Sequence, residues 1–252
     1  MPTIDAHDPG TICWIDLASS DAAGATEFYC ELFGWTAGEP IEDAGGYRML
    51  LHRGRQVAGL APCWGDTDRS AWSTYVASAD AVETCAAALA SGGDVVMDAM
   101  DVLSAGRMAI LRDPAGAQIS LWEAGEHRGY ELQGEPGTPL PSELLTRDLT
   151  TACSFYRSVF GWTAEQQAGD RTLWRLHDEP VARALELDGS RGEDDESHWR
   201  VAIATSDCDA TARLCSALGG LVRSQPADAP GGRGALLEDP AGALFAVVAA
   251  RD

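Results

Sequence analysis

Residues 10–36 read GTICWIDLASSDAAGATEFYCELFGWT, and residues 137–163 read GTPLPSELLTRDLTTACSFYRSVFGWT. Asp21 and Asp148 lie 127 positions apart in these two stretches. The Phe-Tyr pairs at their centres and the Gly-Trp-Thr triplets at their ends keep the same separation. Landmarks that recur at one fixed spacing indicate a repeated structural unit. The chain of 252 residues is therefore predicted to be a tandem duplication.

The repeat continues beyond these two stretches. Trp72 recurs as Trp199, and an Asp-Pro-Ala-Gly tetrapeptide at residues 113–116 recurs at residues 239–242. A stretch rich in Gly and Pro separates the two copies. The sequence predicts an N-terminal domain at residues 8–124, a linker at 125–136 and a C-terminal domain at 137–250.

Each copy contains the pattern of a strand followed by a helix. Apolar residues alternate with other residues from Cys13 to Leu17, which is typical of a strand. Asp21 is placed to cap a helix whose apolar positions recur every three or four residues, and Gly34 is placed to end it. The tetrapeptide at 113–116 suits a tight turn between two further strands. The prediction is an α+β fold, with the order β-α-β-β-β occurring twice in each copy.

A second helix is expected to start after Asp80, which is followed by Glu83 in the pattern of a capping box. We expect Val82, Ala86 and Leu89 to form its apolar face.

Composition excludes several classes of function. The chain has 39 acidic and 18 basic residues and a net charge of −21, so nucleic acid and anionic membrane surfaces are not expected partners. Every basic residue is Arg, which rules out catalysis through a lysine Schiff base. The seven cysteines show no paired spacing, and no long apolar segment or signal sequence is apparent. A reduced, cytoplasmic protein without a membrane anchor is expected.

The duplicated set of Asp21, Phe28-Tyr29, Phe33-Gly34-Trp35 and the 113–116 tetrapeptide resembles the vicinal oxygen chelate superfamily. That superfamily includes glyoxalase I, extradiol dioxygenases and bleomycin-resistance proteins. More narrowly, the chain is similar to bacterial proteins with two glyoxalase-like domains. The resemblance implies that each domain consists of two βαβββ modules, which together form a cup-shaped mixed sheet.

In the metal-dependent members, the ligands are His or Glu residues at set distances from the helix caps and the tight turns. The resemblance places Trp14, Ser73 and Ser120 at those positions in the first copy. The corresponding residues of the second copy are Pro141, Arg200 and Ala246. None of them is a normal ligand of a divalent transition metal. Neither a metal site nor a cofactor is therefore expected, although a set of Glu123, His127 and Glu143 stays open as an alternative.

Residues with the same parity as these positions are expected to face the cup. In the first copy they form an aromatic and hydroxylated surface, which either binds an organic ligand or fills the space left by the metal. These residues are Trp14, Asp16, Ser73, Tyr75, Gln118, Ser120 and Trp122.

Two carboxylates occupy equivalent positions on the two expected cup faces, Asp16 and Glu143. Burial would raise the pKa of either side chain and make it a general acid or base, with Tyr75 as a hydrogen-bond donor. Alternatively, each carboxylate pairs with an Arg or faces solvent. Arg200 is a candidate to hold a carboxylate or phenolate of a ligand. The rest of the second face is mostly apolar and is expected to be a filled core.

Three hypotheses follow, in order of preference. The first is a metal-independent protein that binds an aromatic or apolar secondary metabolite. The second is a metal-free isomerase, cyclase or lyase that uses Asp16 or Glu143. The third is a metal-dependent dioxygenase or glyoxalase relative with unusual ligands. The expected partner is a small aromatic molecule, and the expected state is a monomer with an internal pseudo-dimer, or a homodimer.

Overall fold

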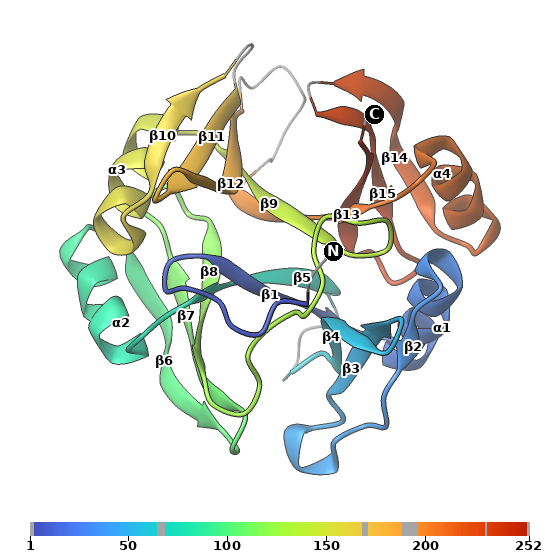
Figure 1. Cartoon of the computed structure of the whole chain (residues 1–252), viewed down its shortest axis with the longest axis horizontal. Coiled ribbons are helices and arrows are strands. Elements are labelled where there is room, and N and C mark those ends of the chain that lie inside the picture. The colour runs from blue at the N-terminus through green and yellow to red at the C-terminus, as the bar shows by residue number, and fades with distance from the viewer. Residues whose placement is uncertain (1–2, 65–68, 168–170, 188–195, 230, 251–252) are drawn as a thin grey trace.

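A computed structural model describes residues 3–64, 69–167, 171–187, 196–229 and 231–250. The chain forms two mixed sheets of eight strands, one from each copy of the repeat. Figure 1 shows the second sheet above the first, with one pair of helices at the left and another pair at the right. Among the helices of the described ranges, none combines the length and the apolar character that a membrane crossing requires.

The first sheet has the strand order β2-β3-β4-β1-β5-β8-β7-β6. Its strands are β1 (Ile12–Ser19), β2 (Thr36–Ala37), β3 (Arg48–His52), β4 (Arg55–Pro62), β5 (Ala71–Ala77), β6 (Asp94–Val102), β7 (Gly106–Arg112) and β8 (Gln118–Ala124). Two α-helices accompany it, α1 (Ala22–Phe33) and α2 (Ala81–Ala90), together with a short 3-10 helix at Glu42–Ala44.

The second sheet repeats this arrangement in the order β10-β11-β12-β9-β13-β16-β15-β14. Its strands are β9 (Pro139–Thr146), β10 (Thr163–Gln166), β11 (Arg171–Leu176), β12 (Glu179–Glu186), β13 (His198–Ala204), β14 (Leu221–Ala229), β15 (Gly232–Glu238) and β16 (Leu244–Ala249). Its helices are α3 (Leu149–Phe160) and α4 (Cys208–Ala217).

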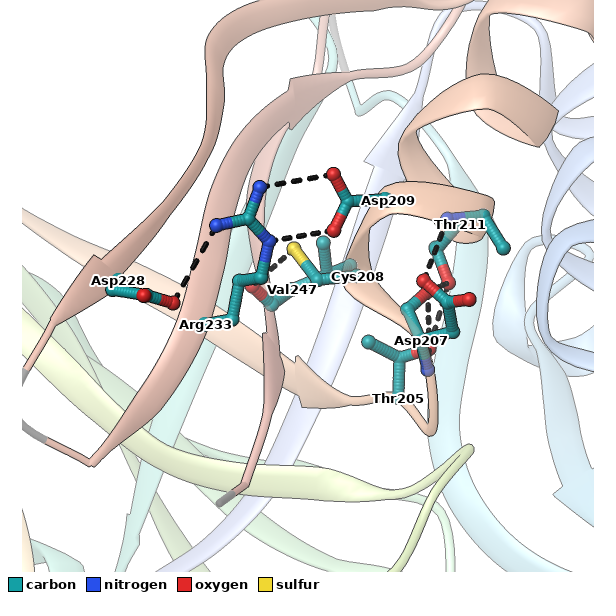
Figure 2. A network of polar contacts seen from close by, with 9 residues as sticks. Thr205, Asp207, Cys208, Asp209, Thr211, Asp228, Arg233 and Val247 are labelled. Atoms are coloured by element: carbon teal, nitrogen blue, oxygen red, sulfur yellow. Dashed lines mark hydrogen bonds and ion pairs between the residues drawn. The ribbon is translucent and has the colours of Figure 1, made fainter.

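The helix boundaries follow from the predicted caps. The side chain of Asp21 accepts a hydrogen bond from the backbone N–H of Gly24, and Gly34 ends α1 in the left-handed conformation with φ of 67°. Asp148 and Gly161 do the same for α3. Figure 2 shows the corresponding start of α4, where Asp207 is the cap. The predicted order β-α-β-β-β is thereby confirmed for all four modules.

The predicted apolar face of α2 was wrong. Val82, Ala86 and Leu89 are exposed, and the buried residues are Ala81, Cys85 and Ala88. An Ala-rich helix has apolar residues on more than one face, so its periodicity is ambiguous. The smaller side chains face inward, where α2 packs closely against β6 and α3.

Strand pairing shows how the modules combine. Strand β1 pairs with β5 in antiparallel fashion and with β4 in parallel fashion, so the two modules of one copy share one sheet. Strands β9, β13 and β12 repeat this pattern. The strands therefore pair within each copy, as the resemblance implied.

The helices join the two copies on the convex sides of the sheets. Tyr29 of α1 donates a hydrogen bond to Asp239 at 3.1 Å, and Tyr156 of α3 donates one to Asp113 at 2.9 Å. Between the sheets, the hydroxyl of Thr74 donates to that of Ser142 at 3.0 Å. The residues that made the repeat recognisable in the sequence therefore build the contact between the domains, and the concave faces of the sheets point away from it (Figure 1).

Candidate functional site

The concave surface of the first sheet, which we call the N-terminal face, contains the residues predicted for the first cup. Trp14 lies opposite Tyr75 in the β1–β5 pairing, and Asp16 lies opposite Ser73. Tyr75 in turn lies opposite Ser120 of β8. Directly paired residues point to the same side of a sheet, so these side chains share one face. Gln118 and Trp122 lie two residues before and two residues after Ser120 in β8, so they lie on the same face as well.

Asp16 is the polar centre of this face. Its Oδ2 atom accepts hydrogen bonds from the phenol of Tyr75 at 2.9 Å and from the phenol of Tyr47 at 3.4 Å. Tyr47 also accepts a hydrogen bond from the indole Nε1 of Trp14 at 2.8 Å. Asp16 is partly buried, whereas Trp14 and Tyr75 are buried. The carboxyl is thus held between two phenols, within a network that involves β1, β5 and the loop before β3.

Burial raises the pKa of Asp16 from its ordinary 3.8 to about 6, although the hydrogen bonds from Tyr75, Tyr47 and Ser73 act in the opposite direction. The pKa values of Tyr47 and Tyr75 are raised well above 10, first by burial and second by the charge of Asp16. The two phenols therefore keep their protons and act as donors. Asp16 is the one group of the three that changes its protonation state near neutral pH.

Tyr47 reaches Asp16 because a glycine lies between them in the sheet. Gly59 of β4 is the direct partner of Asp16, and a Cβ atom built on Gly59 would lie 1.8 Å from the Tyr47 hydroxyl oxygen. Any other residue at this position would expel the Tyr47 ring. Tyr47 was not predicted as a site residue, because it lies in the loop before β3 and reaches Asp16 only through the space that Gly59 leaves.

His127 covers the aromatic part of the face. Its ring contacts Trp14 edge-to-face with centroids 4.3 Å apart, and its carbonyl accepts a hydrogen bond from the indole of Trp122 at 2.8 Å. Burial lowers the pKa of His127 to about 4, so the ring is neutral at pH 7. Its two nitrogens have no hydrogen-bond partner among the described residues. This packing favours the alternative in which Trp14 and Trp122 fill the cup, and it leaves Asp16 and Ser73 on the accessible side.

Methionine side chains lie on both sides of these residues on the N-terminal face. Met49 is the direct partner of Gly59 on one side of Asp16. On the other side, Met108 is the partner of Trp122 and of Met100, and Met97 is the partner of Ile110. The face therefore carries every methionine of the chain except Met1. Thioether side chains are flexible and polarisable, and they pack well against aromatic rings.

One hollow lies at the edge of this face, and a second lies between the two copies on the convex side. One, of about 240 Å³, extends past Trp122 and is bordered by His7, Cys13 and Arg128. The other, of about 640 Å³, lies between the start of α1 and the turn at 240–241, and it carries the acidic side chains of Asp21, Glu27 and Glu31. Neither hollow includes Asp16.

The residues at the metal positions do not fit a divalent cation. Within the described ranges, no three side chains of His, Cys, Asp or Glu come together as a metal ion would require. The alternative set of Glu123, His127 and Glu143 is not assembled. Glu123 accepts a hydrogen bond from the backbone N–H of Ala81 at the start of α2, and Glu143 belongs to the other sheet.

The corresponding surface of the second sheet, which we call the C-terminal face, is charged. Glu143 accepts hydrogen bonds from Arg171 at 3.4 Å and from Arg200, so Glu143 and Arg200 point to the same side, as predicted. Arg183 of β12 is the direct partner of Glu143 on the other side. The expectation of a mostly apolar, filled core was wrong here. It missed Arg171 and Arg183, which lie on strands that were not assigned in the second copy.

The two halves of the chain match two related family models. Residues 11–121 match the Glyoxalase/Bleomycin resistance protein/Dioxygenase superfamily, and residues 143–248 match the glyoxalase-like domain. In solved structures, the chain is similar to the Mn(II)-bound glyoxalase from Novosphingobium aromaticivorans, with a TM-score of 0.67, 15% identity, and coverage of 96% of this chain and 82% of that one. It is also similar to the 2,3-dioxygenase LapB from Pseudomonas sp. KL28, with a TM-score of 0.63, 13% identity, and coverage of 96% and 92%.

Curated relatives are much more similar in sequence. The anthracycline biosynthesis protein DauV from a Streptomyces species is 40% identical, over 97% of this chain and 94% of the relative. DnrV from Streptomyces peucetius, described in the same words, is 39% identical over the same shares of the two chains. The putative glyoxylase CFP32 from Mycobacterium bovis is 37% identical over 98% of both chains. The chain therefore belongs to the glyoxalase, bleomycin-resistance protein and dioxygenase superfamily, with two glyoxalase-like domains in tandem.

Proposed function

We propose that this protein binds a small, apolar, fused-ring aromatic metabolite on the N-terminal face without a metal ion, and that Asp16 recognises a hydroxyl group of that ligand. The observation that carries the proposal is the Asp16 carboxyl, held by Tyr75 and Tyr47, beside methionine side chains and packed aromatic rings. Such a combination of apolar area with a few placed polar groups is typical of sites for small organic molecules.

The apolar lining supports a flat ligand. Met97 and Met108 are partly buried and Met100 is exposed, so their side chains have surface left to contact a ring. Gln118 is exposed at the far end of the same row, where it offers an amide to a polar substituent. The two most similar curated relatives named above are described as anthracycline biosynthesis proteins, and anthracyclines contain fused aromatic rings.

Acid–base catalysis on the bound molecule is a second candidate, favoured by the pKa of about 6 at Asp16. A carboxyl with this pKa exists in both forms near neutral pH, so it can take up a proton and release it again. Asp16 would accept a proton from one position of the ligand and return it to another. The product is an isomer, and the proton balance closes without a further reactant.

Calorimetric titration with a neutral hydroxylated anthraquinone tests the binding proposal. The substitution Asp16→Asn should weaken binding about 10-fold or more, because the amide oxygen stays with the two phenols and the second carboxylate oxygen becomes an NH2 group, which cannot accept from the ligand hydroxyl. The matched substitution Glu143→Gln, at the equivalent position of the other sheet, should change the Kd by less than about 2-fold. Equal affinity of the wild type and the Asp16→Asn protein would overturn the proposal.

The catalytic candidate has a separate readout. At saturating anthraquinone, formation of an isomer is followed by chromatography, and its rate should rise with pH through about 6 in the wild type. Asp16→Asn should lower this rate by roughly 10²–10⁴-fold. A rate that is the same in both proteins would remove Asp16 from catalysis while leaving the binding proposal intact.

We also propose that the chain acts as a monomer in the cytoplasm. Contacts between the two copies already cover the convex sides of both sheets, and the described cysteines form no disulfide with one another. Light scattering should give a mass near 26.6 kDa, and a mass of twice that value would favour a homodimer.

A further inference from the structure

The C-terminal face carries three arginines and one carboxylate on neighbouring strands. Arg183 and Arg200 lie directly opposite Glu143 on the two strands that flank β9, and Arg171 reaches the same carboxylate from β11. The side chains of direct partners share one side of the sheet, so these positive charges lie on the concave surface. Together, these four residues carry two more positive charges than negative ones.

This excess is unusual for the molecule. The whole chain has a net charge of −21, and several arginines elsewhere each pair with a carboxylate, such as Arg55 with Glu131 and Arg107 with Asp101. Figure 2 shows Arg233, whose guanidinium donates to Asp209 at 2.5 and 3.0 Å and to Asp228 at 3.4 Å. Arg233 is thus paired with two carboxylates, whereas Arg171 and Arg200 are both paired with the single carboxylate of Glu143.

Burial makes the excess charge energetically significant. The side chains of Arg200 and Glu143 are only 18% and 13% exposed. The Nε atom of Arg200 is buried, and it has no acceptor among the residues that the structure describes. A buried donor without an acceptor costs roughly 1–3 kcal/mol. An incoming oxyanion would supply the missing acceptor.

Arg183 extends across the concave surface. Its guanidinium nitrogens lie 3.5 and 3.6 Å from the point where a Cβ atom on Gly231 would be, so the side chain reaches from β12 to the β14–β15 hairpin. Among the described residues, no carboxylate forms an ion pair with it. Beside Arg200, the concave side also carries Ala202, which is paired with Ala246. Guanidinium groups next to small apolar residues suit an anion with an organic body.

We propose that the C-terminal face is a second ligand site, which takes a small organic carboxylate between Arg183 and Arg200. Glu143 forms ion pairs with Arg171 and Arg200 and offsets part of their positive charge. This site differs from the N-terminal face in ligand class, and it lies on the opposite side of the molecule (Figure 1).

Calorimetric titration with benzoate tests this site, with its neutral isostere benzamide and with inorganic phosphate as comparisons. We expect benzoate to bind, benzamide to bind at least about 10-fold more weakly, and benzoate affinity to fall as salt rises. Benzamide binding as tightly as benzoate, or the absence of benzoate binding, would overturn the proposal. Phosphate binding more tightly than benzoate would also overturn the carboxylate assignment.

Substitutions at single arginines test whether benzoate binds on the C-terminal face. Arg183→Gln should weaken benzoate binding about 10-fold, and it breaks no ion pair among the described residues, so the fold should persist. Arg223→Gln, an exposed arginine paired with Glu238, is the control and should leave the benzoate Kd unchanged. If the two variants have the same Kd, the site is elsewhere. Asp16→Asn should not affect benzoate binding, so the anthraquinone and benzoate proposals succeed or fail separately.

Discussion

The two concave faces have the same strand order but different chemistry. Where the N-terminal face has Asp16 between two phenols, the C-terminal face has Glu143 between two arginines. Tyr75 is replaced by Ala202 at the equivalent position 127 residues later. One face therefore offers a carboxyl of raised pKa among methionines, and the other offers an excess of guanidinium groups.

On the convex sides, by contrast, the two copies have the same residues and form the same contacts. Tyr29 and Asp239 form the same hydrogen bond as Tyr156 and Asp113. The indole of Trp72 donates to Tyr29 at 3.0 Å, just as another tryptophan donates to Tyr156 at 2.8 Å. Residues that are alike in both copies thus join the domains, whereas residues that differ line the faces. Positions that are alike in the two copies therefore indicate a role in packing. The chemistry of ligand binding has to be inferred from the positions at which the copies differ.

The largest expected effect concerns the shared interface. Trp162 is 1% exposed, and its indole donates to the carbonyl of Gly10 at 2.6 Å; Trp35 makes the matching bond to Gly137 at 2.7 Å. Trp162→Ala should lower the free energy of unfolding by about 3–5 kcal/mol, and Trp35→Ala by a similar amount. Urea denaturation should remain a single transition in both variants. A separate transition for the unmutated domain would show that the domains fold independently.

A pH-dependent effect on stability is expected at Asp16. Because the pKa of Asp16 is higher in the folded state than in the unfolded chain, its contribution to stability is full below about pH 4 and is lost as pH rises through about 6. The shift corresponds to about 3 kcal/mol at most. Asp16→Asn should remove this part of the pH dependence between pH 4 and 7.

Urea titrations at several pH values measure that effect. Burial also raises the pKa values of Asp113 and Asp239, but those groups are unchanged in the variant, so the difference from wild type isolates Asp16. An unfolding free energy that depends on pH in the same way in both proteins would contradict the assignment.

A smaller effect is expected at Gly59. Gly59→Ala should cost about 1–3 kcal/mol, because the new methyl group would occupy the position of the Tyr47 hydroxyl. Gly38→Ala is the control, since a Cβ atom there would have no neighbour closer than 3.5 Å. In a Tyr47→Ala background, the cost of Gly59→Ala should disappear. A persistent cost in the double variant would mean that backbone strain, and not Tyr47, is responsible.

The smallest effect concerns the C-terminal face. Glu143→Gln removes the one carboxylate that the arginines share, so benzoate should bind about 2- to 5-fold more tightly. Titration with benzoate at low salt measures the change. Weaker binding would show that Glu143 is needed mainly to hold Arg200 in place.

Much of the fold could be predicted from sequence. The duplication, the caps at Asp21 and Asp148, and the assignment of Asp16 and Tyr75 to one face all follow from fixed spacing or from local periodicity. The face of α2 could not be predicted, because apolar residues occur all around that helix. In that case the packing partner decides which side is buried.

The sequence by itself determined which side chains point to the concave face of each sheet, because alternation along a strand is a property of the backbone. Only the tertiary structure decided which of them meet. Tyr47 reaches Asp16 over Gly59, and Arg183 reaches the distant hairpin at Gly231. These contacts depend on the curvature of the sheet and on the space that a glycine leaves, which arise only when residues distant in sequence pack together.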